Sequence, residues 1–238
     1  MKTAWLKHEG AEELLLLFNG WGMDSRLGKH LLMTSLEEEF TPDLLICYDY
    51  HTLTLDPVVM EEISRYRRIT IVAWSFGVWV AQQTRLPAVT GAIAINGTLH
   101  PVHAEKGIRP EVFEATLSTW SEVSRQRFNR RMCGSSDALA LFTTISPDRS
   151  STSQQEELSR LKERLLLAEA TGASGITEAT ETPWSYDHAI IGEKDLVFPA
   201  QQQYAAWEGL PRTVVADMPH FPFHHFKKLQ EVLACFRP

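Results

Sequence analysis

The chain is poor in cysteine and has no long hydrophobic run. Its three cysteines, Cys47, Cys133 and Cys235, are widely spaced among 238 residues. An odd and scattered set of this kind argues against a disulfide framework and a cysteine-based metal site, and favours reduced thiols in the cytoplasm. The longest aliphatic run, residues 14–18, is too short to span a bilayer, and residues 1–10 lack the apolar stretch of a secretion signal. We therefore expect a cytoplasmic protein that does not insert into a membrane.

An excess of positive charge is missing as well. The formal net charge is −7 at neutral pH, which argues against sequence-independent binding to nucleic acids. Hydrophobic residues make up 44% of the chain and there are seven tryptophans, so a substantial core can form. A length of 238 residues favours one large domain with an insertion over two independent domains.

Apolar segments alternate with helical patterns along most of the chain. This alternation indicates right-handed βαβ units, so the predicted fold class is α/β, with a mainly parallel central sheet flanked by helices. The predicted strands are 14–19, 44–50, 69–74, 91–96, 188–192 and 212–216. The helices expected between and after them are 27–39, 57–64, 78–85 and 229–236.

The pattern changes after residue 98. Three segments there are typical of helices, with no strand pattern between them: 117–131, 137–144 and 154–170. We predict that this helical insertion forms a cap over the core. The chain then divides into a first part of the core, the cap insertion and a second part of the core, at residues 1–98, 99–183 and 184–238.

A serine between small residues follows one of the predicted strands. The pentapeptide Ala73-Trp74-Ser75-Phe76-Gly77 comes directly after an apolar run, and the residues after it continue as a helix. A nucleophilic serine on a strained strand-to-helix turn needs small neighbours, because two backbones approach closely there. A serine hydrolase is therefore the leading hypothesis. The alternative for this segment alone is a tight turn without a catalytic role.

A serine nucleophile needs a base, and His220 is the best placed of nine histidines. It lies between the last predicted strand and the last helix, in a loop that can bring an imidazole to the carboxyl edge of the sheet. His224 and His225 are the competing candidates. Both fall nearer the start of the helix, where exposed surface positions are expected.

Asp195 is the predicted partner of that imidazole, since it follows the predicted strand 188–192. Its carboxylate would accept the second imidazole proton and stabilise the imidazolium. Asp187 precedes the same strand and would lie at the opposite edge of the sheet, and Asp217 is very close to His220 in sequence. The chain order Ser75, Asp195, His220 is that of the α/β-hydrolase triad.

Two backbone N–H groups are predicted to form an oxyanion hole. One belongs to Phe76, directly after the serine, and the other to Trp21, in the loop after the first predicted strand. Gly20 and Gly22 flank Trp21 and allow the sharp turn that a donor in this loop requires.

With these segments in hand, the chain resembles the α/β-hydrolase superfamily across essentially its whole length. More closely, it resembles the BioG-type pimeloyl-[acyl-carrier protein] methyl ester esterases of biotin synthesis. The segments that carry this resemblance are 18–24 (FNGWGMD), 74–77 (WSFG), 95–98 (INGT) and 220–223 (HFPF). Two departures from the general superfamily pattern exist: Ala73 replaces the first glycine of the serine motif, and Asn19 replaces the usual histidine of the oxyanion loop.

The resemblance implies hydrolysis of the methyl ester on a pimeloyl chain carried by acyl carrier protein. Carried over by position, Ser75 is the nucleophile, His220 the base and Asp195 its orienting acid, while the N–H groups of Trp21 and Phe76 hold the oxyanion. An apolar channel is needed for the acyl chain, and we expect Trp21 and Phe113 to contact it. This chemistry requires no metal and no cofactor.

A basic cluster in the predicted cap fits such a partner. Four arginines without an acid among them fall in 125–131: Arg125, Arg127, Arg130 and Arg131. Acyl carrier proteins are strongly acidic, so we expect these arginines to dock one. A solvated helix face is the alternative. A second cluster follows with acids interspersed among its bases, which are Arg149, Arg160, Lys162 and Arg164, diluted by Glu156, Glu157 and Glu163.

Two other functions are compatible with the residues. One is a thioesterase or small-ester serine hydrolase of an unrelated pathway. The other is an acyl-binding module that keeps the fold without turnover. Activity on short esters without regard to carrier protein would favour the first, and failure of a fluorophosphonate to label the serine would favour the second.

Overall fold

The computed structural model describes residues 1–170 and 184–236. The last part of the predicted insertion, 171–183, lies outside the described residues. Within the described residues, no helix is both long enough and apolar enough to cross a membrane. All three cysteines are free thiols, and burial raises the pKa of Cys47 and of Cys133 to about 12.

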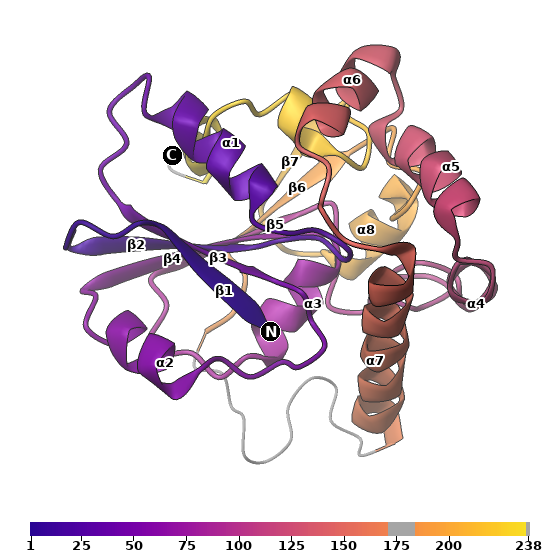
Figure 1. Cartoon of the computed structure of the whole chain (residues 1–238), viewed down its shortest axis with the longest axis horizontal. Coiled ribbons are helices and arrows are strands. Elements are labelled where there is room, and N and C mark those ends of the chain that lie inside the picture. The colour runs from indigo at the N-terminus through magenta and orange to yellow at the C-terminus, as the bar shows by residue number, and fades with distance from the viewer. Residues whose placement is uncertain (171–183, 237–238) are drawn as a thin grey trace.

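A seven-stranded sheet forms the centre of the molecule (Figure 1). Its order is β1-β3-β2-β4-β5-β6-β7, and only β1 runs antiparallel to its neighbour. The mainly parallel sheet predicted from the alternation of apolar and helical segments is thus confirmed. The strands are β1 Lys2–Lys7, β2 Glu13–Phe18, β3 Asp43–Tyr48, β4 Arg68–Trp74, β5 Gly91–Ile95, β6 His188–Gly192 and β7 Arg212–Val215.

The middle strands end together at one edge of the sheet. Phe18 at the end of β2 pairs with Ala73 of β4 on one side and with Cys47 of β3 on the other. Their apolar side chains are fully buried, because helices cover both faces of a parallel sheet. The residues that follow these strands therefore meet at the carboxyl edge, where open α/β sheets bind their ligands.

Helices lie on both faces of the sheet (Figure 1). α1 and α9 contact each other on one face, whereas α2 and α3 lie on the other. The helices are α1 Arg26–Ser35, α2 Pro57–Ile63, α3 Phe76–Gln83, α4 Pro110–Ser118, α5 Glu122–Cys133, α6 Ser136–Thr144, α7 Ser151–Ala170, α8 Ala200–Ala206 and α9 Leu229–Ala234, with a 3₁₀ turn at Pro222–His224.

Helices α4 to α7 follow one another between β5 and β6 and gather beside the carboxyl edge of the sheet (Figure 1). The single helix expected over 117–131 is wrong, because α4 ends at Ser118 and α5 begins at Glu122. Ser121 and Ser124 form a reciprocal capping box, in which each side chain bonds the other residue's backbone N–H. This cap starts a new helix where a continuous one was expected.

Besides most of α4, two elements are absent from the prediction: β1 and α8. β1 pairs along the outer side of β3, and its lysines and half-exposed side chains are typical of an edge strand. α8 is a short helix of only seven residues with three glutamines, so its sequence has little of the apolar periodicity by which helices are found.

Candidate active site

Ser75 occupies a strained turn between β4 and α3. Its φ of 60° and ψ of −129° are outside the regions that residues with a side chain usually adopt. The Ser75 N–H donates to the Ile95 carbonyl at 3.0 Å, which ties the turn to β5. A Cβ at Gly77 would lie 2.4 Å from the Asn19 carbonyl oxygen, so only glycine allows α3 to approach the loop after β2 so closely. Such a turn presents a serine at the carboxyl edge of the sheet.

Gly97 supports the turn from the neighbouring strand, and its replacement tests that support. A Cβ at Gly97 would lie 2.3 Å from the Ser75 carbonyl oxygen. We expect Gly97→Ala to lower the free energy of unfolding by about 1–3 kcal/mol, because backbone must move to relieve the overlap. The same shift displaces Ser75, so labelling by a fluorophosphonate should slow about tenfold or more, in line with the cost of a small misplacement.

Gly209→Ala is the control for this substitution. Gly209 has a φ of +81° but open space around it, so alanine there is strained without meeting a neighbour. Its cost should be about 1–2 kcal/mol, with labelling of Ser75 unchanged. Urea unfolding and labelling rates of both variants provide the measurement. Wild-type stability and labelling for Gly97→Ala would contradict the expected overlap.

A chain of hydrogen bonds joins the three side chains predicted to be catalytic. His220 Nε2 lies 3.0 Å from Ser75 Oγ, and His220 Nδ1 lies 2.9 Å from Asp195 Oδ2. The exposed fractions are only 6% for Ser75, 2% for His220 and 4% for Asp195. In this geometry the imidazole can take a proton from the hydroxyl while the carboxylate stabilises the imidazolium that forms.

The Asp195 carboxylate is held by donors on both oxygens. Oδ1 accepts hydrogen bonds from the backbone N–H groups of Val197 at 2.7 Å and Phe198 at 2.8 Å. Oδ2 accepts one from Gln203 Nε2 at 3.1 Å, besides facing His220. These hydrogen bonds fix the orientation of the carboxylate, so Asp195 is suited to orient a histidine. The role of Gln203 is not visible in the sequence, because α8 itself was not predicted.

Asn96 fixes the loop that carries His220. Its Nδ2 donates to the carbonyls of Pro219 at 2.8 Å and His220 at 3.1 Å, and its Oδ1 accepts from the Gly192 N–H at 2.8 Å. Asn96 has a φ of 45°, a conformation that asparagine tolerates better than most residues. One amide side chain thereby connects β5, β6 and the histidine loop. Trp74 Nε1 adds a second bond to the His220 carbonyl, at 2.9 Å.

The competing residues lie elsewhere. Asp187 accepts a hydrogen bond from the Ala92 N–H near the start of β5, at the edge opposite to Ser75, as expected. Asp217 is exposed at the surface. His224 is half-buried and His225 exposed, and their rings pack edge to face against each other. Among the described contacts, none of these four side chains bonds Ser75 or His220.

The two predicted oxyanion donors are free of protein acceptors. Within residues 1–170 and 184–236, neither the Trp21 N–H nor the Phe76 N–H makes a hydrogen bond to the protein. Phe76 is the first residue of α3, where backbone N–H groups have no partner in the helix. Both residues also line the cleft that contains Ser75.

A cleft with about 400 Å³ of empty space, its open mouth included, brings most of the predicted residues together. Ser75, Trp21, Phe76 and Phe113 all line it, along with apolar side chains of α4 and α7. Its wall includes one basic residue, Arg131, whose guanidinium lies over the Phe128 ring, 5.4 Å from the ring centre. The Ser75 hydroxyl thus opens onto a mainly apolar cleft.

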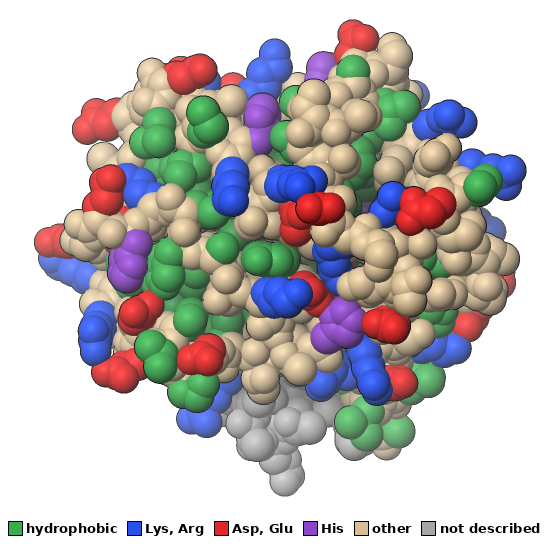
Figure 2. Space-filling model, in the orientation of Figure 1, with side chains coloured by type: hydrophobic (Ala, Val, Ile, Leu, Met, Phe, Trp, Pro, Cys, Tyr) green, Lys and Arg blue, Asp and Glu red, His purple; other side chains and the backbone are tan. Residues whose placement is uncertain are grey.

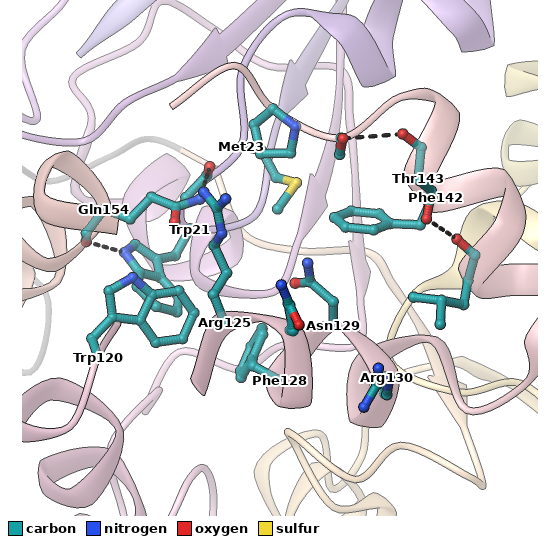
Figure 3. A pocket seen from close by; sticks show the side chains of 15 residues that line it. Trp21, Met23, Trp120, Arg125, Phe128, Asn129, Arg130, Phe142, Thr143 and Gln154 are labelled. Carbon is teal, nitrogen blue, oxygen red and sulfur yellow. Dashed lines mark hydrogen bonds between the residues drawn. The ribbon is translucent and has the colours of Figure 1, made fainter. Parts of the chain in front are cut away.

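Two larger open pockets adjoin this cleft and share the Phe128 side chain with it. One, with about 930 Å³ of empty space including its mouth, lies between α5, α6 and the loop after β2, and Figure 3 shows Trp21, Trp120, Phe128 and Phe142 around it. The other has about 940 Å³ of empty space, its mouth again included, and lies between α4 and α5. Both pockets share wall residues with the cleft and extend the space next to it.

The four predicted docking arginines have different surroundings. Arg125 pairs with Glu122 and donates to the Arg149 carbonyl at 2.8 Å, so its charge is already engaged. Arg127, Arg130 and Arg131 are exposed and pair with no carboxylate of the described chain. Figure 2 shows basic side chains over the region of α5, at the upper right, with some acidic ones among them. Of these three, Arg127 and Arg130 lie outside the wall of the cleft that contains Ser75.

Arg131 shares the wall of the cleft with Ser75. Partial removal of its guanidinium from water lowers the pKa of Arg131, and the charge of Asp195 acts in the opposite direction. In the described part of the chain, no three His, Cys, Asp or Glu side chains are grouped to hold a metal ion.

Comparison with solved structures places the fold. BioG from Haemophilus influenzae aligns over 100% of both chains, with a TM-score of 0.82 and 28% identity. A lipase-esterase related protein from Clostridium acetobutylicum aligns over 99% of both chains, with a TM-score of 0.64 at 14% identity, which supports the fold alone. The α/β-hydrolase fold expected from the sequence is confirmed.

Two relatives found by sequence carry different names. A Bacteroides fragilis protein named malonyl-[acyl-carrier protein] O-methyltransferase is 40% identical over 201 residues, which are 83% of this chain and 37% of that protein. An uncharacterized Haemophilus influenzae protein is 41% identical over 138 residues, 56% of this chain and 58% of its own length. The chain thus spans little more than a third of the first relative and over half of the second. A family model described as pimeloyl-ACP methyl esterase BioG matches residues 1–232, and the chain belongs to this family.

Proposed function

We propose that this protein hydrolyses the methyl ester of a pimeloyl group carried by acyl carrier protein, in biotin synthesis, through an acyl-serine intermediate. The observation that carries the proposal is the hydrogen-bonded chain from Ser75 through His220 to Asp195, in a chain of the BioG family. The cytoplasm is the proposed location, and residues 99–183 are proposed to act as a cap over the core formed by 1–98 and 184–238.

The reaction begins with attack of Ser75 Oγ on the ester carbonyl carbon, while His220 Nε2 accepts the hydroxyl proton. The carbonyl oxygen becomes negatively charged and receives hydrogen bonds from the N–H groups of Trp21 and Phe76. The bond to the methoxy oxygen then breaks, and His220 returns the proton to it, so methanol leaves. Water, activated by His220, attacks the acyl-serine and releases the free carboxylic acid and Ser75.

The surroundings of Ser75 suit a long, uncharged chain. Trp21 and Phe113 line the cleft, where we propose that they contact the acyl chain. Burial of a methylene chain against apolar side chains contributes about 0.8 kcal/mol per CH₂ group. The adjoining cavities offer space for the rest of the carrier-linked substrate.

The name of the Bacteroides fragilis relative fits the same substrate chemistry. Transfer of a methyl group to an oxygen of a malonyl group yields a methyl ester on acyl carrier protein. A BioG-type esterase would act on that kind of bond. Transfer of a methyl group is no part of the present proposal, since a serine, a histidine and an aspartate in hydrogen-bond contact serve hydrolysis.

Methanol release tests the proposal directly. Wild-type protein should release methanol from methyl-pimeloyl carrier protein in step with the appearance of a free carboxylate. A thioesterase would instead release the acyl chain from the carrier without methanol. An acyl-binding module without turnover would leave the substrate intact and would not be labelled by a fluorophosphonate.

Charge reversal on α5 tests how the carrier protein binds. Acyl carrier proteins are acidic, so exposed Arg127 and Arg130 are proposed to attract one. We expect the double variant Arg127→Glu, Arg130→Glu to lower kcat/KM for the carrier-linked ester about 100-fold at low salt, and to leave a small methyl ester within about twofold.

The matched control reverses two exposed arginines elsewhere, Arg65→Glu and Arg67→Glu, beyond the end of α2. Its net charge changes by the same amount, so any effect of overall charge appears in both variants. Kinetics with both substrates at several salt concentrations provide the measurement. Equal losses on both substrates, or equal losses in the control, would contradict docking through Arg127 and Arg130.

A further inference from the structure

Glu157 is a carboxylate in α7 that the proposed mechanism does not use, although it contacts the oxyanion loop. Its side chain is 0% exposed. Oε2 accepts a hydrogen bond from the Gly22 N–H at 3.1 Å, and Oε1 accepts one from the Tyr50 N–H at 2.7 Å. A helix of the insertion is thus bonded to the loops that follow two strands of the sheet. A carboxylate is buried only where partners stabilise it, since removing a charge from water is costly.

Arg149 neutralises this carboxylate. Its Nη1 lies 2.6 Å from Glu157 Oε2 and its side chain is only 7% exposed. The same guanidinium donates to the Met23 carbonyl at 3.3 Å and pairs with Asp49 at 3.4 Å. Burial raises the pKa of Glu157, and the charge of Arg149 and the hydrogen bond from Tyr50 oppose this shift. The sequence groups Arg149 with Arg160, Lys162 and Arg164 in a second basic cluster, but the burial of its side chain excludes Arg149 from a docking face.

Gln154, one turn before Glu157, holds the other side of the loop. Its backbone carbonyl accepts a hydrogen bond from Trp21 Nε1 at 2.8 Å, and its Nε2 donates to the Gly22 carbonyl at 2.9 Å. Figure 3 shows the contact between Trp21 and Gln154 at the wall of the large cavity. Both backbone polar groups of Gly22 and the Trp21 ring are therefore bonded to the same helix.

These contacts restrict the direction of the Trp21 N–H, one of the two proposed oxyanion donors. The peptide plane that carries the Gly22 N–H begins at the α-carbon of Trp21, and the Trp21 N–H is attached to the other side of that α-carbon. With the ring and the following peptide both held, rotation about the Trp21 backbone is restricted. Gly22 adopts a φ of +77°. Because glycine has no side chain, its backbone could adopt several other conformations if these hydrogen bonds were absent.

We propose that Glu157, paired with Arg149, is a positioning residue that keeps the Trp21 N–H directed at the oxyanion. This inference rests on the proposed function in one respect, the use of Trp21 as an oxyanion donor. Removal of one such donor lowers kcat by about 10²–10³-fold in a serine protease, which sets the scale of the expected effect.

Three variants test the proposal. Glu157→Leu keeps most of the side-chain volume and removes both acceptors. Glu157→Gln keeps one carbonyl oxygen for the Gly22 N–H. Glu163→Gln, on the exposed face of the same helix, is the control. The readouts are kcat and KM for methyl-pimeloyl carrier protein, the rate at which a fluorophosphonate labels Ser75, and the melting temperature.

We expect Glu157→Leu to lower kcat and the labelling rate by a similar factor, about 100-fold, with KM within about threefold. Glu157→Gln should lose less than Glu157→Leu in both rates, and Glu163→Gln should match the wild type. A role in stability alone would lower the melting temperature and leave the rates of the folded protein unchanged. Wild-type rates in folded Glu157→Leu or Glu157→Gln would overturn the proposal.

Labelling separates this inference from the substrate assignment. A fluorophosphonate needs a reactive Ser75 and the oxyanion donors, but neither a methyl ester nor a carrier protein. Slow labelling of Glu157→Leu with no methyl ester hydrolysis by the wild type would preserve the positioning role and remove the proposed substrate. Hydrolysis of the methyl ester by the wild type, together with wild-type rates for Glu157→Leu, would preserve the proposed substrate and remove the positioning role. Failure of the wild type to label would overturn both.

Discussion

Ser75→Ala is expected to lower kcat for methyl ester hydrolysis by about 10⁵–10⁶-fold, the effect of removing the nucleophile in a serine protease. The hydroxyl is the only group of the proposed mechanism that forms a covalent bond to the substrate. Alanine keeps the Cβ and therefore the strained backbone of the turn, so the fold should be unchanged. Single-turnover kinetics, with circular dichroism as the check on folding, provide the measurement.

Ser118→Ala is the control for Ser75→Ala, because the Ser118 hydroxyl is exposed and donates only to carbonyls of its own helix. This variant should keep wild-type rates. Activity of Ser75→Ala within about tenfold of the wild type would show that another group attacks the ester, since loss of the nucleophile is worth far more than that. In that case the acyl-serine intermediate would be wrong even if the ester is the substrate.

Asp195→Asn is expected to lower kcat by about 10⁴-fold, as the equivalent change does in a serine protease. Asp195 Oδ2 faces His220 Nδ1 at 2.9 Å and Gln203 Nε2 at 3.1 Å. The Val197 and Phe198 N–H groups bind Oδ1, so an asparagine carbonyl is held there. Its NH₂ group then faces His220, which must present an unprotonated Nδ1. The proton moves to Nε2, which can no longer accept one from Ser75.

Asp217→Asn is the matched control for Asp195→Asn, with the same chemical change at an exposed carboxylate. It should leave kcat unchanged. The pH dependence of the rate distinguishes the two explanations of a loss: hydroxide can replace the missing base, so the activity of Asp195→Asn should recover at high pH. A loss below about tenfold, in a folded variant, would contradict the role of Asp195 as the orienting acid.

The buried strands were predictable because each is a nearly continuous apolar run. β2, β4 and β5 lie in the middle of a parallel sheet, where both faces are covered, so their sequences contain few polar residues. β1 lies at the edge and lacks that signature. The separation of α4 from α5 depends on the capping box of Ser121 and Ser124, and polar caps of this kind do not change the apolar periodicity by which helices are predicted.

The candidate site was predictable where its residues follow strands. Ser75, Asp195 and Trp21 come directly after buried segments, and parallel strands bring such positions to one edge. The supporting residues are different. Asn96 bonds partners 96, 123 and 124 residues away, and Glu157 bonds Gly22 across 135 residues.

Burial decides the role of a charged residue, and sequence composition does not report it. The sequence groups Arg149 and Glu157 with the other charges of the same region, yet they form a buried pair beside the oxyanion loop. The spacing of apolar residues did not predict which face of α7 is buried, because this helix has apolar residues on more than one face. Contacts of this kind follow from the tertiary arrangement of the insertion against the sheet.

Intact mass spectrometry of methyl-pimeloyl carrier protein, after incubation with the protein, tests the central claim most directly. The wild type should decrease the mass of the carrier by one CH₂ group, as the methyl ester becomes a free acid, while the thioester stays intact. Incubation with Ser75→Ala should leave the mass unchanged. Loss of the whole acyl chain, or conversion that persists with Ser75→Ala, would contradict a methyl esterase that acts through Ser75.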